Sequence, residues 1–149
     1  MTSFFDQASY QVRFEWGTEG LGRLAASDVV IVVDVLRFSS TLVSAVADGP
    51  VPLEAARTWS GNGAAVSDAA AATGAVVLVG GLRNASAVAD AVVRLQDERQ
   101  QRTFVTVIAA GERATDGALR FAVEDQLGAG AVIAALTDRG IDHSSPEAA

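Results

Sequence analysis

The chain has 149 residues, of which half are hydrophobic and 19% are charged, so it can bury a sizeable core and is expected to form one domain over residues 1–149. Its net charge of −7 argues against nucleic acid or an anionic membrane as the main partner. There is no cysteine, and all eleven basic residues are arginine, which excludes thiol nucleophiles, disulfides and lysine Schiff bases.

The N-terminus gives no sign of export. Residues 1–10 lack the basic region and apolar core of a secretory signal, and no apolar run reaches the ~20 residues of a membrane span. The absence of cysteine also fits a protein of the cytoplasm, where disulfides are rare. We therefore expect a cytoplasmic protein.

Four segments have the pattern of β-strands. Residues 10–16 alternate between apolar and polar side chains, which is typical of a half-exposed strand. Residues 29–33 are five consecutive β-branched residues, which predicts a buried parallel strand. Further strands are predicted at 75–79 and 103–109. Residues 51–53 are a candidate short edge strand, since Pro52 cannot occupy a central one.

Helices are predicted at 39–47, 64–72, 85–96 and 119–136. Asp48-Gly49-Pro50 ends the first of them, Gly74 ends the second and Asn84 caps the third. Residues 138–149 lack periodicity and are expected to form a loose tail. The alternation of strands and helices predicts a single-domain α/β fold with a mainly parallel sheet flanked by helices.

Small and polar residues follow each predicted central strand. Because the carboxyl ends of parallel strands share one edge of the sheet, these residues could converge on a ligand there. Glycines at such positions let a ligand approach the backbone closely, although glycines after strands are more often simple turn residues. The residues concerned are Asp34, Arg37, Gly80, Gly81, Asn84, Gly111 and Glu112.

The segment after the first central strand has two interpretations. Asp34, Arg37 and the hydroxyl-bearing helix start at Ser39 could form a site for a cation and a phosphate. Alternatively, this is an ordinary strand, turn and helix in which Ser39 caps the helix and Asp34 pairs with Arg37. The pattern of this segment alone favours neither interpretation.

The acidic pair of the last predicted helix also has two interpretations. Glu124 lies three residues from both Phe121 and Leu127, which places it on or beside the apolar face. A carboxylate buried there needs an arginine or a cation as partner, and an oxygen-rich set of ligands suits Mg²⁺ better than zinc. Alternatively, Glu124 and Asp125 lie on the helix surface and are balanced by Arg120.

Glycines within this helix, Gly128 and Gly130, each cost roughly 1 kcal/mol relative to alanine. Such residues are tolerated where another backbone or a ligand packs very close. This small-residue face would therefore also suit a structural oligomer subunit, in the simplest case a homodimer. His143, the single histidine, lies in the tail and is expected to be exposed, which disfavours a Ser-His-Asp triad.

Three segments, taken in order, resemble the 2-phosphosulfolactate phosphatase family. Asp34-Val35-Leu36-Arg37 and the helix start at 39–41 are similar to the first signature of that family. Residues 82–89 resemble its Leu-x-Asn-Ala-Ser-Ala-Val-Ala segment. Gly111-Glu112 together with residues 120–131 resembles its glycine-rich acidic helix. The order and approximate spacing also agree, and the resemblance covers most of residues 10–138.

The resemblance implies an α/β fold and a Mg²⁺-dependent phosphatase. Its substrate would be a small phosphorylated acid, 2-phospho-3-sulfolactate, which is hydrolysed to sulfolactate and phosphate on the way to coenzyme M. On matching positions, catalytic roles fall to Asp34 and Arg37. Cation binding falls to Asp34, Glu112, Glu124 and Asp125. The substrate oxygens would be bound by Ser39, Ser40, Asn62, Asn84 and Ser86.

The chain departs from the family pattern in the middle and at the end. The Thr-Thr-x-Asn-Gly-Thr motif is reduced to residues 58–64, in which Asn62 remains. The Gly-Phe-Asp-x-Gly-Asn-Ser-Pro segment and the C-terminal part of the family have no counterpart. The alternative function is therefore a shortened relative that binds a small anion or a partner without catalysis.

Overall fold

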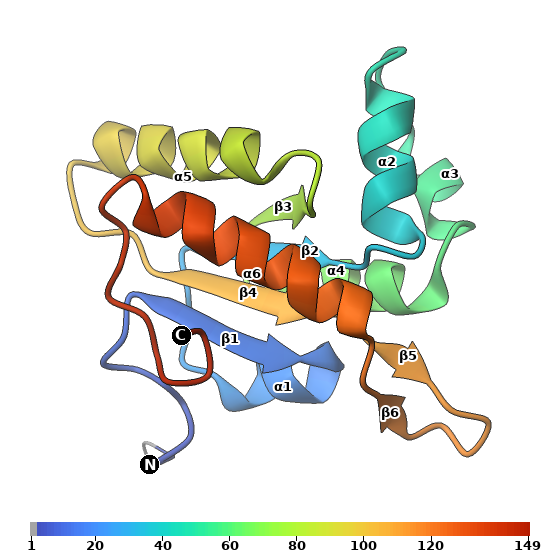
Figure 1. Cartoon of the computed structure of the whole chain (residues 1–149), viewed down its shortest axis with the longest axis horizontal. Helices are drawn as coiled ribbons and strands as arrows, with labels where there is room; N and C mark the ends of the chain where they lie inside the picture. The colour runs from blue at the N-terminus through green and yellow to red at the C-terminus, as the bar shows by residue number, and fades with distance from the viewer. Residues whose placement is uncertain (1–2) are drawn as a thin grey trace.

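A four-stranded parallel sheet forms the centre of the computed structural model, which describes residues 3–149. Its strands lie in the order β1-β4-β2-β3 (Figure 1), and every neighbouring pair is parallel. They comprise β1 (Val12–Trp16), β2 (Val29–Val33), β3 (Val76–Gly80) and β4 (Val105–Ala109). The predicted α/β class and parallel sheet are thus confirmed.

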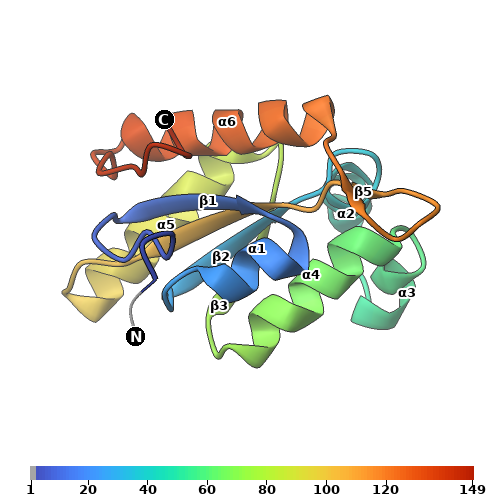
Figure 2. The same cartoon turned by 90° about the horizontal axis from the view of Figure 1, so that it is seen from below.

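Helices cover both faces of this sheet. α5 (Ala85–Arg99) and α6 (Val123–Thr137) lie on one face, and α1 (Gly17–Arg23) and α4 (Gly61–Ala72) lie on the other (Figures 1 and 2). Two further helices, α2 (Phe38–Val46) and α3 (Leu53–Arg57), stand beyond the carboxyl ends of the strands. Across residues 3–149, no helix is long and apolar enough to cross a membrane.

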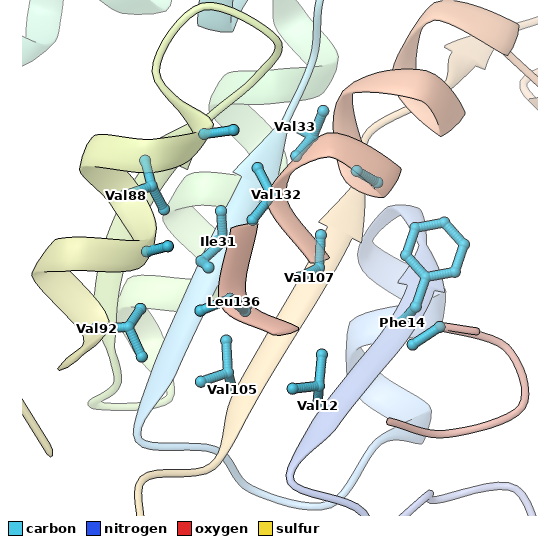
Figure 3. Close-up of a cluster of buried hydrophobic side chains, with 14 of the residues drawn as sticks. Val12, Phe14, Ile31, Val33, Val88, Val92, Val105, Val107, Val132 and Leu136 are labelled. Carbon is cyan, nitrogen blue, oxygen red and sulfur yellow. The ribbon is translucent and has the colours of Figure 1, made fainter. Parts of the chain in front are cut away.

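The β-branched strands supply both layers of the core. Figure 3 shows Ile31 and Val33 of β2 directed toward Val88 of α5 and Val132 of α6. The alternate residues of β2 point to the opposite face, where Val66 of α4 packs against them. A strand buried on both faces needs apolar residues at every position, which accounts for the unbroken run at 29–33.

Two sequence predictions of secondary structure are wrong. Residues 51–53 do not form an edge strand, because Pro52 instead precedes the helix α3. The last helix begins at Val123 rather than at 119, because residues 112–120 fold back as a hairpin. Its strands β5 (Glu112–Arg113) and β6 (Leu119–Arg120) are antiparallel, and Gly117 in the connection has a φ of +83°.

The C-terminal tail is not loose, contrary to expectation. The Ser145 amide donates to the carbonyl of Val12 at 2.9 Å, and the Val12 amide donates to the carbonyl of His143 at 3.0 Å. Ile141 is buried in the main core. The segment lacks helical or strand periodicity because it is an ordered coil that runs along the outer edge of β1.

The N-terminal segment covers the next part of the same edge. The Gln7 side chain donates to the carbonyl of Phe14 and accepts from the amide of Phe14, both at 3.0 Å. Gln7 is buried and thereby replaces a neighbouring strand at this position. Both ends of the chain are therefore attached to β1.

Substitution of Ile141 tests whether the tail contributes to stability. Ile141→Ala removes a core side chain and should lower the free energy of unfolding by about 2–5 kcal/mol. Asp142→Ala, at the adjacent exposed position, is the matched control and should change it by less than about 0.5 kcal/mol. Urea unfolding followed by circular dichroism measures both, and equal values for the two variants would contradict the ordered tail.

Candidate active site

Asp34 lies at the carboxyl end of β2, where its side chain is only 3% exposed. Its Oδ2 accepts hydrogen bonds from the Ser60 hydroxyl at 2.5 Å and from the Gly63 amide at 3.1 Å. Ser60 is also the N-cap of α4, since its hydroxyl accepts from the Gly63 amide at 3.2 Å. Burial raises the pKa of Asp34, and these hydrogen bonds oppose the rise.

Ser39 fixes the turn that leaves Asp34. The Asp34 amide donates to the Ser39 hydroxyl at 2.8 Å, and the Ser39 amide donates to the Asp34 carbonyl at 2.7 Å. Ser39 is 1% exposed and lies inside α2, whose N-cap position is occupied by Arg37. Ser39 is therefore not the predicted N-cap. Its hydroxyl holds the backbone of the turn, while Ser40 beside it is half-buried.

Asp125 connects three elements. It projects from the first turn of α6, where its Oδ1 accepts from the Val35 amide at 2.7 Å and its Oδ2 accepts from the Gly111 amide at 2.9 Å. Val35 follows β2 and Gly111 follows β4, so one carboxylate joins two strand exits to a helix. Burial raises the pKa of Asp125 to about 6, and the negative charges of Asp34 and Glu124 add to the rise.

Glu124 is half-buried and close enough to Asp34 and Asp125 for its charge to raise both of their pKa values. Its expected position on the buried face of the helix is wrong, because Asp125 occupies that face instead. The expectation counted Phe121 as a helical residue, whereas that residue precedes the helix. Three carboxylates thus meet at the carboxyl edge of the sheet.

Among residues 3–149, no arginine forms an ion pair with Asp34, Glu124 or Asp125. Arg37 is exposed, and within residues 3–149 it makes no ion pair with Asp34, so the predicted pair is absent. Arg120 lies 3.8 Å from Glu112, and both side chains are exposed in the hairpin. Arg120 therefore balances Glu112 rather than the acidic pair of α6.

Two asparagine side chains bind backbone carbonyl groups near the carboxyl ends of the strands. Asn62 donates to the carbonyl of Gly111 at 3.1 Å, which ties α4 to the end of β4. Asn84 donates to the carbonyl of Val79 at 2.9 Å, and its Oδ1 is buried without a hydrogen-bond partner in the described part of the chain. Asn84 occupies the N-cap position of α5 but makes no side-chain cap. The Oδ1 of Asn84 thus lacks a donor among the described residues, which is uncommon for a buried polar atom.

Ser86 lies outside this arrangement. Its exposed hydroxyl accepts from the Arg139 guanidinium at 2.7 Å, and Arg139 also pairs with Asp90 at 2.7 Å. These contacts join α5 to Arg139, two residues beyond the end of α6. Ser86 therefore serves the contact between two helices in this structure.

The four carboxylates predicted to bind a cation are only partly brought together. Within residues 3–149, no three side chains of histidine, aspartate or glutamate are arranged to hold a metal ion. Glu112 is on the hairpin surface, and both oxygens of Asp125 accept backbone amides. Asp34 and Glu124 remain, and Mg²⁺ is commonly held by one or two carboxylates together with phosphate oxygens and water.

Ser60 and Gly63 were not among the predicted site residues. Ser60 directly precedes the residues Gly61-Asn62-Gly63, and serine before a helix is an N-cap signal that would have placed the start of α4 here rather than at Ala64. Gly63 is required for space, because a Cβ there would lie 2.7 Å from both the Asp34 Oδ2 and the Phe38 side chain.

The fold and the site together define the class of protein. It is an α/β protein with an open parallel sheet, and buried carboxylates at the carboxyl edge of that sheet form its candidate site. The model of the 2-phosphosulpholactate phosphatase family matches residues 54–148, which is more than half of the chain, and the chain belongs to this family. Comparison of the chain with curated proteins and with solved structures gave no significant match. The matched range contains Ser60, Glu124 and Asp125, while Asp34 precedes it.

Gly63 and Gly61 form a matched pair for testing the packing around Asp34. Gly63→Ala should lower the free energy of unfolding by about 1–3 kcal/mol, because the methyl group displaces Asp34 or Phe38. Gly61→Ala meets no atom within 4 Å and should be neutral or stabilising by up to about 1 kcal/mol. Urea unfolding of both variants measures the difference, and equal stabilities would show that Gly63 is not constrained by Asp34.

Asp125 should make stability depend on pH. Its pKa of about 6 lies above the ordinary 3.8, so the folded protein holds this proton more tightly than the unfolded chain. Its contribution is therefore complete below about pH 4 and is lost as the pH rises through about 6, a change of about 3 kcal/mol. Asp125→Asn should remove this part of the pH dependence of urea unfolding, whereas Gln126→Asn, on the exposed side of α6, should retain it. An unchanged pH dependence in Asp125→Asn would contradict the raised pKa.

Proposed function

We propose that the protein is a Mg²⁺-dependent phosphatase that hydrolyses a small acidic phosphomonoester, with 2-phosphosulfolactate as the first substrate to test. The observation that carries the proposal is the meeting of Asp34 and Glu124 at the strand exits in a member of this family. The family match supports phosphatase chemistry, and the carboxylates supply the oxygen ligands that Mg²⁺ prefers.

In this proposal Asp34 and Glu124 hold the cation, which supplies a positive charge for the phosphoryl oxygens. The exposed Arg37, beside Asp34 in the chain, binds the phosphate from the solvent side. The unpartnered Oδ1 of Asn84 accepts a hydrogen bond from substrate or water. Ser40 lies in the first turn of α2 and donates to a substrate oxygen.

The reaction breaks one bond and forms one bond. In one route water attacks phosphorus while the ester oxygen leaves and takes up the proton that water gives up, which yields an alcohol and inorganic phosphate. In the other route the carboxylate of Asp34 attacks phosphorus and the alcohol leaves, and water then hydrolyses the aspartyl phosphate to inorganic phosphate and free Asp34. Water reaches the phosphorus in either case, so no other reactant is needed. In the direct route Asp34 must be deprotonated, and the hydrogen bonds from Ser60 and Gly63 favour that form.

The alternative, an anion-binding relative without catalysis, is less well supported by the charges at the site. Asp34, Glu124 and Asp125 are all acidic, and each raises the cost of bringing a phosphate to this edge. Without a cation, the nearest positive group along the chain is the exposed Arg37. Calorimetry with inorganic phosphate separates the functions, since binding in the absence of Mg²⁺ and without turnover indicates the anion-binding module.

Phosphate release from a panel of small phosphomonoesters, including 2-phosphosulfolactate, tests the proposal. Turnover should require Mg²⁺, and Asp34→Asn should lower kcat by about 10²- to 10³-fold, the effect of losing one well-placed charged group. Asp116→Asn, at the exposed tip of the β5–β6 hairpin, is the control and should retain activity. Absence of turnover of every member of the panel, with the wild-type protein folded and supplied with Mg²⁺, would refute the phosphatase function.

A further inference from the structure

The carboxylates of the site differ in which of their oxygens accept hydrogen bonds. Both oxygens of Asp125 accept backbone amides. In the described part of the chain, the two donors to Asp34, the Ser60 hydroxyl and the Gly63 amide, both bind Oδ2. The Phe38 amide also interacts with this carboxylate, which has about four acceptor sites in all. Oδ1 of Asp34 therefore keeps acceptor capacity for a cation, or for attack on phosphorus.

The start of α4 is shaped to receive Oδ2. Asp34 follows β2 on the face of the sheet that α4 covers, as Val32 does two residues earlier. α4 begins at the carboxyl edge of the sheet (Figure 2), so its first turn reaches Asp34. The N-terminal end of a helix carries a partial positive charge, which favours a carboxylate there. Gly63 leaves the necessary space, because a Cβ at its position would lie 2.7 Å from Oδ2.

Ser60 does more than cap this helix. Its oxygen accepts the Gly63 amide at 3.2 Å, which is the usual role of an N-cap, and its hydroxyl proton is donated to Asp34 at 2.5 Å. That distance is typical of a hydroxyl that donates to an ionised carboxylate. On the other side of Ser60, Trp59 packs against the buried Phe38 and Ala56. The backbone of Ser60 is therefore held from both sides, and the direction in which its hydroxyl donates is fixed.

We propose that Ser60 is a positioning residue, whose hydroxyl anchors Oδ2 of Asp34 to α4 and thereby presents Oδ1 to the cation or to phosphorus. The two oxygens of a carboxylate diverge, so Oδ1 is directed away from α4. Glu124 approaches from α6, on the opposite face of the sheet. A ligand held between Asp34 and Glu124 therefore meets Oδ1. The catalytic consequence rests on the proposed function, whereas the orientation of Asp34 does not depend on it.

Kinetics of three variants test the catalytic consequence. Ser60→Ala should lower kcat for phosphomonoester hydrolysis by about 10- to 100-fold, the usual effect of losing a group that orients a metal ligand, and should leave KM nearly unchanged. Ser60→Thr keeps the hydroxyl and should restore kcat. Ser67→Ala is the matched control, because Ser67 is buried in the same helix and donates to the Gly63 carbonyl at 2.8 Å rather than to Asp34. A wild-type kcat in Ser60→Ala, or an equal loss in Ser67→Ala, would overturn the catalytic role.

Crystal structures of the wild-type protein and of Ser60→Ala test the orientation without requiring turnover. In Ser60→Ala the Asp34 carboxylate should rotate or occupy two orientations, and a single, unchanged orientation would overturn the inference. Absence of turnover over the whole substrate panel refutes the phosphatase function alone, and the crystal comparison then still decides whether Ser60 positions Asp34. Should Ser60→Ala fail to fold, Ser60→Gly gives the same test, because glycine is tolerated at an N-cap better than alanine.

Discussion

The buried carboxylate of Asp125 is the interaction on which the candidate site depends. It accepts the amides of Val35 and Gly111, which lie two residues beyond the ends of β2 and β4. Backbone amides at strand exits otherwise lack partners, and leaving them buried and unpaired is costly. One carboxylate of α6 therefore accepts hydrogen bonds from the backbone amides at both strand exits, and it sets the position of the helix over the sheet. Asp34 and Glu124 are neighbours because Asp125 holds their elements together.

Close packing of glycine supports the same arrangement. A Cβ on Gly128 would lie 2.7 Å from Val35, and a Cβ on Gly80 would lie 2.8 Å from Ile31. These contacts let α6 and the end of β3 approach β2 more closely than side chains would permit. Gly63 does the same for α4 against Asp34. At these three positions the lack of a side chain lets neighbouring elements pack closely at the carboxyl edge of the sheet. The close packing brings the carboxylates near one another despite their mutual repulsion.

The sequence was sufficient to predict the parallel sheet and the edge of it at which several candidate residues lie, for reasons that lie in particular residues. Continuous β-branched runs located β2 within its observed bounds, and parallel topology placed Asp34, Asn84 and Gly111 at one edge. The position of Glu124 could not be predicted, because α6 is apolar on nearly every side and periodicity does not identify its buried face. That face is selected by contacts of Gly128 and Asp125 with distant loops. The hairpin at 112–120 was missed because Leu119 and Phe121 continue the apolar pattern of the helix that follows, and the tail was missed because ordered coil has no period.

The attachment of both chain ends to β1 has a consequence for solubility. A strand at the rim of a sheet presents unpaired amides and carbonyls that can recruit a strand from another molecule. Here the Gln7 side chain and residues 143–145 occupy those groups on β1, so this rim is closed to intermolecular strand addition. The opposite rim, β3, pairs on one side only. The two terminal segments therefore protect β1 against aggregation. Deletion of either segment would expose unpaired backbone groups of β1 without removing any residue at the carboxyl end of the sheet.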